Sequence, residues 1–159
     1  ADATGGESLL VDGFAAVQLL CQENPSAYED LLRIPVNFRF VDKEWDLRWN
    51  SPTIRLDQKG RLEEIRYHNA LTATRETGFD DMTKLYDGLR AFTQILRRKE
   101  LELKFKLEPG DVMVFHNRRV LHGRAEFDPN SGSRKLRGCY VDCDQAWSKL
   151  RVSQAMNKL

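Results

Sequence analysis

The hydrophobic pattern is most regular in the second half of the chain. Residues 101–107 (LELKFKL) alternate apolar and charged side chains, which predicts a strand with one buried face. Residues 108–111 contain a Pro-Gly pair and predict a turn. The short apolar run at residues 112–115 then predicts a second, buried strand.

Two candidate functional residues follow these strands. A reversal begins at Asn117, and the chain then returns inward toward His122. After a polar loop, Arg134 opens a further predicted strand that includes residues 136–141. Because one loop separates the two segments, we expect His122 and Arg134 to lie on neighbouring antiparallel strands.

Helical periodicity dominates the beginning of the chain. A short strand at residues 9–11 precedes a helix at residues 14–22, for which Asp12 or Gly13 is the expected cap. A second helix is predicted at residues 27–33. Pro25 precedes it, and proline is tolerated at an early helical position.

Strand patterns follow in the next part of the chain. Residues 36–40 alternate apolar and polar side chains and predict a half-buried strand. Residues 44–52 contain two Trp four positions apart, which fits either a helical turn over the sheet or a loop that acts as a lid. A hairpin is predicted from residues 53–57 and 61–67, with Gly60 at the turn position that favours a positive φ.

The strongest helical pattern spans residues 82–98, where apolar side chains recur every three or four positions. Asp80 or Asp81 is the expected cap of this helix. A short terminal helix is predicted at residues 144–153, with Trp147 on its inner side together with Leu150 and Arg151.

Composition narrows the functional classes. The 159 residues are 41% hydrophobic and 31% charged, as in a soluble globular protein, and no apolar run approaches the ~20 residues of a membrane span. A net charge of +1 without a basic stripe argues against nucleic-acid binding. Three cysteines without framework spacing favour a reducing compartment, the cytoplasm, with the mitochondrion as the alternative. The oligomeric state stays open, and a homodimer is one expectation.

The residue types at positions 122 and 134 suit metal-dependent oxidation. Neutral imidazole is a good Fe(II) ligand, and an iron held by two histidines and one carboxylate keeps positions open for a co-substrate and oxygen. The planar fork of Arg clamps a carboxylate in a bidentate way that Lys does not reproduce. His122 is therefore a candidate metal ligand, and Arg134 is a candidate clamp for a chelating dicarboxylic acid. Purely structural roles fit the same spacing.

Separated motifs resemble one family. Residues 110–124 (GDVMVFHNRRVLHGR) and 133–142 (SRKLRGCYVD) resemble the C-terminal motif of the 2-oxoglutarate-dependent oxygenases. Residues 4–14 (TGGESLLVDGF) and 66–69 (RYHN) resemble the same family, in the same order and at approximately the same spacing. The resemblance is strongest to the branch that holds gamma-butyrobetaine dioxygenase and trimethyllysine dioxygenase, and it covers nearly the whole chain.

The resemblance implies a double-stranded β-helix (jelly roll), mainly β with inserted helices. Residues 1–159 would form the C-terminal portion of a single catalytic domain. The resemblance also implies Fe(II), 2-oxoglutarate and molecular oxygen, with ascorbate as a further reductant. By the resemblance, His122 binds iron, Arg134 binds the distal carboxylate of 2-oxoglutarate, and Ser8 helps to hold the same co-substrate. For Ser8, a turn hydroxyl without a ligand is the alternative.

The resemblance further implies a small quaternary ammonium substrate. Tyr140 matches one wall of an aromatic cage, where ring faces attract a trimethylammonium group without a hydrogen bond; ordinary packing is the alternative. His68 stands where the branch usually carries the first of two Asn residues, and Asn69 matches the second. A histidine at a substrate-contacting position changes size and hydrogen bonding, which leaves the exact substrate open.

The first two iron ligands of the family come from a His-x-Asp or His-x-Glu motif, which this sequence lacks. His68 is followed two residues later by Ala70, and His116 by Arg118, so neither histidine supplies the motif. We therefore expect the chain to be part of a longer enzyme. We also expect it to be inactive by itself, because a metal site requires its full ligand set.

The sequence thus predicts Fe(II)- and 2-oxoglutarate-dependent hydroxylation of a trimethylammonium carboxylate, with gamma-butyrobetaine first. Residues 142–151 resemble the gamma-butyrobetaine subgroup, whereas residues 5–14 resemble the trimethyllysine subgroup, so the second substrate stays in consideration. A taurine-type dioxygenase comes third. The alternative from another class is a non-catalytic jelly-roll binding or scaffold protein of the same ancestry.

Overall fold

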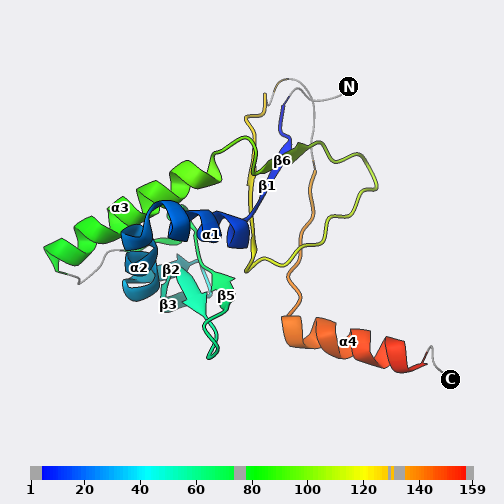
Figure 1. The fold of residues 1–159 in the computed structure, drawn as a ribbon. Helices are drawn as coiled ribbons and strands as arrows, with labels where there is room; N and C mark the ends of the chain where they lie inside the picture. Colours follow the sequence, from blue (N-terminus) through cyan, green and yellow to red (C-terminus); the bar gives the residue numbers. More distant parts are fainter. Residues whose placement is uncertain (1–4, 74–77, 129, 131–134, 157–159) are drawn as a thin grey trace. The chain divides into compact units, whose positions relative to one another are not determined.

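The computed structural model of the chain describes residues 5–73, 78–128, 130 and 135–156. The chain forms two compact units, one of which is Gly5–Phe127, while the other combines Ala1–Thr4 with Asp128–Leu159. The elements, drawn in Figure 1, are β1 (Ser8–Asp12), α1 (Gly13–Glu23), α2 (Pro25–Arg33), β2 (Pro35–Val41), β3 (Asp46–Pro52), β4 (Ile54–Leu56), β5 (Leu62–Ile65), the 3-10 turn η1 (Asn69–Leu71), α3 (Phe79–Leu96), β6 (Glu102–Phe105), β7 (Val120–Arg124) and α4 (Cys143–Met156).

Side-chain caps start the first two helices. The Asp12 carboxylate accepts the Phe14 N–H at 3.0 Å at the start of α1, which confirms one of the two predicted caps. At the start of α2, the Asn24 side chain accepts the Ala27 N–H at 3.1 Å, and Pro25 occupies the first helical position. These bonds satisfy N–H groups that have no partner within the helix.

The hydrophobic core lies where α1, α2 and α3 pack on one another and on the neighbouring strands. The Cβ that alanine would add at Gly88 lies 3.1 Å from Leu31 Cγ, so this glycine allows α3 to approach α2 closely. The fully or nearly fully buried apolar residues include Ala16, Val17, Leu20, Leu31, Ile34, Val36, Ile54, Ile65, Leu85, Phe92 and Ile95.

The third helix starts earlier than its periodicity predicts. α3 begins at Phe79, and Asp80 and Asp81 lie within its first turn rather than at its cap. Gly78 occupies the cap position, and no side chain bonds there. The predicted aspartate cap is therefore wrong, although acidic residues in a first turn still complement the helix dipole.

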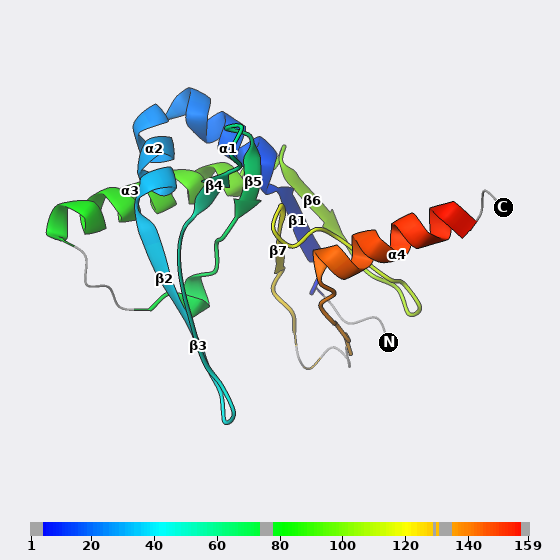
Figure 2. The same ribbon diagram turned by 90° about the horizontal axis from the view of Figure 1, so that it is seen from below.

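Antiparallel pairing organises the strands of the first unit. β1 lies between β6 and β7, while β2 pairs with β3 and β4 pairs with β5. The β4–β5 hairpin was predicted, and Gly60 has the expected positive φ of 74°. Residues 46–52 form β3, so neither the helical turn nor the lid loop is right. Figure 2 shows the β2–β3 hairpin projecting away from the helices.

Two predicted strands are absent from the residues that the structure describes. In the first, Val112 and Val114 are 86% and 89% exposed and have no strand assignment. In the second, residues 135–141 form no strand. An apolar or alternating pattern marks a segment that is able to form a strand, but a strand also requires a backbone partner.

The second unit contains α4, which is longer than predicted. No residue of α4 is buried, and Trp147 is 56% exposed, so the predicted inner side is wrong for this structure. In the described part of the chain, every helix is too short or too polar for a membrane crossing.

Candidate functional site

β1 and β7 bring two of the predicted site residues to one face. In their antiparallel register, Leu10 lies opposite His122, and Ser8 lies opposite Arg124. Residues directly opposite each other point to the same side of a sheet, as do residues two apart along a strand. Ser8 and His122 therefore share a face, as diagonal neighbours on adjacent strands.

The opposite face of this sheet packs on the core. Val11 is buried there, and its partner Leu121 also contacts the core. His122 is consequently turned away from the core, and it is exposed, with its ring 5.0 Å from the ring of Phe115. Ser8 is buried beside it. The sheet thus presents an imidazole that a ligand is able to reach, on a strand that the core holds in place.

The turn that leads into β7 is fixed by main-chain and side-chain bonds. Arg119 and Val120 each donate a backbone N–H to the His116 carbonyl at 2.9 Å. The Arg119 guanidinium donates to both carboxylate oxygens of Asp12, at 3.1 and 2.7 Å. This pair lowers the pKa of Asp12, chiefly through the hydrogen bond from Arg119 and also through the Phe14 N–H. The ion pair joins the start of β7 to the end of β1.

Gly13 makes this close approach sterically feasible. Its N–H donates to the Arg119 carbonyl at 2.9 Å. A Cβ at this position would lie 2.7 Å from that oxygen and 2.6 Å from Ile65 Cδ1. A residue without a side chain is therefore required where α1, β5 and the turn before β7 meet.

His68 follows β5 on a segment that is held from two sides. The Arg66 N–H donates to the Thr53 carbonyl at 2.8 Å. The Tyr67 hydroxyl shares a 2.7 Å hydrogen bond with Thr93 Oγ1 on α3. His68 comes next and is exposed. The sheet and α3 together therefore set the position of the backbone that presents this histidine.

A buried carboxylate connects the two candidate segments. The Glu64 side chain is 9% exposed, and its oxygens lie 3.0 Å from Arg55 Nε, 2.9 Å from Arg66 Nε and 3.7 Å from Arg118 Nε. The Arg118 carbonyl also accepts the Ile65 N–H at 2.8 Å. Sequence reasoning missed this cluster. Its sequence signal was an acidic residue inside the predicted hairpin, followed two positions later by arginine.

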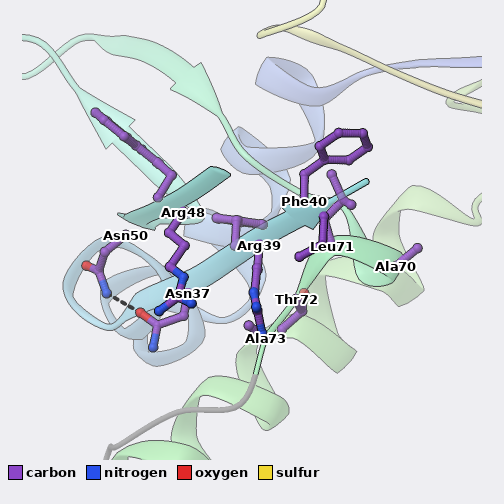
Figure 3. Close-up of a pocket in the computed structure, with 12 residues that line it drawn as sticks. Asn37, Arg39, Phe40, Arg48, Asn50, Ala70, Leu71, Thr72 and Ala73 are labelled. Carbon is purple, nitrogen blue, oxygen red and sulfur yellow. Dashed lines mark hydrogen bonds between the residues drawn. The ribbon is translucent and has the colours of Figure 1, made fainter. Parts of the chain in front are cut away.

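A pocket with both polar and apolar lining lies between the β2–β3 hairpin and residues 70–73, which belong to η1 and the segment after it (Figure 3). Figure 3 shows the hydrogen bond from the Asn50 amide to Asn37 across the hairpin. Arg39 and Arg48 both bind Asp46, at 2.8 and 2.9 Å, and their hydrogen bonds lower the pKa of that carboxyl. Because both guanidinium groups already have a carboxylate partner, the pocket is not a prepared anion site.

The side chains of the remaining predicted residues lie outside the described part of the Gly5–Phe127 unit. Arg134 and the side chain of Asn69 lie outside the part of the chain that the structure describes. Tyr140 belongs to the second unit and is 89% exposed. Among the described residues, no group of three His, Cys, Asp or Glu side chains is arranged to hold a metal ion. His122 alone does not make an iron site, because affinity requires the full ligand set.

Comparison with known proteins gives consistent relationships. Residues 1–140 match the family described as "Taurine catabolism dioxygenase TauD, TfdA family". Gamma-butyrobetaine dioxygenase from Pseudomonas sp. (strain AK-1) is 44% identical over 153 residues, and the Homo sapiens protein of that name is 36% identical over 157. "Trimethyllysine dioxygenase, mitochondrial" from Mus musculus is 35% identical over 157 residues. These matches cover 96%, 94% and 95% of this chain but 40%, 40% and 37% of the relatives.

A solved structure is similar in fold. It belongs to a Burkholderia xenovorans protein assigned to the alpha-ketoglutarate dependent 2,4-D dioxygenases, with a TM-score of 0.61 and 16% sequence identity. The superposition covers 85% of this chain and 56% of that chain. The predicted fold class is confirmed, since the antiparallel sheets with inserted helices are consistent with part of a jelly roll. The chain spans about two-fifths of the length of its curated relatives, and it belongs to the TauD/TfdA family of dioxygenases.

Proposed function

We propose that this chain is the C-terminal portion of the catalytic domain of an Fe(II)- and 2-oxoglutarate-dependent dioxygenase that hydroxylates gamma-butyrobetaine. The observation that carries the proposal is the register of β1 and β7, which sets Ser8 and His122 on one face in a chain of this family. An imidazole and a hydroxyl on adjacent strands suit a metal ligand beside a group that holds the co-substrate.

The residues have separate roles in this proposal. His122 holds iron, which when bound supplies the oxidising chemistry. Ser8 donates a hydrogen bond to 2-oxoglutarate, and Arg134 clamps the distal carboxylate of the same molecule with two parallel bonds. Because the described residues supply one metal ligand, the proposal concerns the longer protein that contains this chain, and the 159-residue chain alone is inactive.

The substrate is a trimethylammonium carboxylate. Tyr140 attracts the quaternary ammonium through the face of its ring, while His68 and Asn69 contact the substrate from the segment after β5. Gamma-butyrobetaine is the first candidate because the bacterial relative of that name is 44% identical. Trimethyllysine is the second candidate, supported by the mouse relative at 35% identity.

The proposed compartment is the cytoplasm. The mitochondrion is the alternative, and the name of the mouse trimethyllysine dioxygenase supports it. The two proposals are separable by fractionating cells that express the longer protein from its own gene.

The test is a substrate panel with the longer protein, Fe(II) and 2-oxoglutarate, with and without ascorbate. We expect succinate release to match hydroxylated product and to fall in the order gamma-butyrobetaine, trimethyllysine, taurine. The 159-residue chain, assayed in parallel, should release none. Absence of succinate with every substrate would overturn the proposed reaction, whereas turnover by the short chain would overturn its inactivity.

A further inference from the structure

The buried carboxylate of β5 lies between two segments that the proposed function uses. We propose that Glu64 is a positioning residue that fixes the strand carrying His122 relative to the segment carrying His68. The roles of the two histidines rest on the proposed function. The linkage through Glu64 is a property of the Gly5–Phe127 unit itself.

Charge and burial make this cluster costly to disturb. Glu64 is almost fully buried, and it is surrounded by the guanidinium groups of Arg55, Arg66 and Arg118. Arg66 is itself mostly buried, and its guanidinium lies 5.2 Å from the centroid of the Trp49 ring. Removing the negative charge leaves a buried cation without its partner, which costs much more than the loss of an exposed ion pair.

Two of these arginines lie shortly before the two histidines along the chain. Arg118 precedes β7 by two residues, and β7 carries His122. Arg66 precedes His68 by two residues. One carboxylate therefore contacts the chain four residues before His122 and two residues before His68. Main-chain hydrogen bonds hold the turn before β7 and β7 itself, so we expect a shift of Arg118 to displace His122.

Main-chain bonding strengthens the same link. The Arg118 carbonyl accepts the N–H of Ile65, the residue between Glu64 and Arg66. The side-chain contact at 3.7 Å and the main-chain bond at 2.8 Å thus act between the same two segments. The ion pair and the main-chain hydrogen bond together define the distance and the orientation between β5 and the turn before β7.

Glu63 provides a matched control. It is the adjacent carboxylate of β5, its side chain is 46% exposed, and it pairs with Arg55 at 3.0 Å. A Glu63→Gln substitution removes the same charge from the same strand, but it breaks an exposed ion pair and leaves the link to Arg118 in place. The comparison separates positioning from a general effect of charge on the hairpin.

The first experiment measures steady-state kinetics of the longer protein. We expect Glu64→Gln and Arg118→Gln to lower kcat about 3- to 30-fold, with a smaller change in the KM for substrate. This is the size of effect that mutations typically have on the energetic coupling between two sites in a protein. We expect more 2-oxoglutarate to be consumed per product formed. Glu63→Gln should stay within about twofold of wild type. Arg118→Lys should recover part of the loss, because it restores the cation without the planar fork.

The second experiment measures amide hydrogen exchange on the same proteins. Peptides that cover residues 116–124 and 66–72 should exchange faster in Glu64→Gln and Arg118→Gln, and not in Glu63→Gln. Peptides from α2 serve as an internal reference. If Glu64→Gln does not fold, Arg118→Gln carries the test, because Arg55 and Arg66 still pair with the buried carboxylate.

The two experiments distinguish the two proposals. If the wild-type protein turns over no substrate, the proposed function fails and hydrogen exchange alone decides the linkage. Unchanged exchange at residues 116–124 in both variants would contradict the linkage. Faster exchange with unchanged kcat and unchanged 2-oxoglutarate consumption would limit Glu64 to a structural role and overturn its assignment as a positioning residue.

Discussion

The two segments that carry the predicted iron ligand and the predicted ammonium cage differ in what holds them. β7, with His122, is bonded to β1 along its length and is joined at its start to Asp12 and Glu64 through Arg119 and Arg118. Residues 135–156, with Tyr140, form no strand in the described part of the chain, and α4 has no buried residue. The core of the Gly5–Phe127 unit therefore defines the geometry around His122, whereas Tyr140 is exposed on a segment without strand structure.

The largest expected difference in stability is between a variant of the core and a variant of α4, and Phe92 provides the core variant. This side chain is fully buried in α3, 5.7 Å from the Tyr67 ring, so Phe92→Ala should destabilise the 159-residue chain by about 3–5 kcal/mol. Trp147→Ala in α4 should change stability by less than about 0.5 kcal/mol, since Trp147 is exposed. Urea unfolding of both variants checks the contrast. Equal losses would show that α4 shares the core.

A smaller loss is expected where α1 meets the turn before β7. Gly13→Ala should cost about 1–3 kcal/mol, because the added methyl overlaps the Arg119 carbonyl and Ile65. Gly123→Ala on β7 is the matched control, since a Cβ there meets no atom within 4 Å. Thermal unfolding of the two variants measures the difference. A stable Gly13→Ala variant would argue against the tight contact.

The smallest expected effect concerns the ion pair that ties β7 to β1. Asp12→Asn keeps the helix cap but removes the charge that Arg119 binds, so stability at pH 7 should fall by about 0.5–1 kcal/mol. Binding to Arg119 lowers the pKa of Asp12 in the folded state. Its contribution is therefore complete above the ordinary carboxyl pKa and is lost as pH falls through the lowered value.

Urea unfolding at several pH values tests this dependence. The difference between wild type and Asp12→Asn should shrink as the solution becomes more acidic than the ordinary range of a carboxyl group. A difference that stays constant down to the pH at which Asp12 is protonated would assign the effect to something other than its charge.

Local signals in the sequence predicted much of the fold. The Asp12 cap, the helix predicted at residues 27–33 and the Gly60 turn each depend on neighbours within a few residues, and each is confirmed, although α2 begins two residues earlier, at Pro25. β3 was missed because Trp45 and Trp49, four positions apart, also fit a helical spacing. The strand predicted at Val112 failed because the pattern does not reveal whether a backbone partner is present.

The site was predicted residue by residue rather than as an arrangement. Ser8 and His122 came from motifs at opposite ends of the chain, and the strand register that joins them is a long-range property. The ion pair between Glu64 and Arg118 is long-range for the same reason, so the local sequence around Glu64 did not reveal it. Arg134 stays a prediction, since it lies outside the described residues.

The most direct measurement is 2-oxoglutarate-dependent hydroxylation by the longer protein with His122→Ala, beside His116→Ala from the preceding turn. If His122 is an iron ligand, its loss should reduce turnover by more than about 100-fold, beyond the effect of losing an outer partner of a ligand. His116→Ala should retain substantial turnover. Comparable activity of His122→Ala and wild type would contradict the assignment of the metal site to β7.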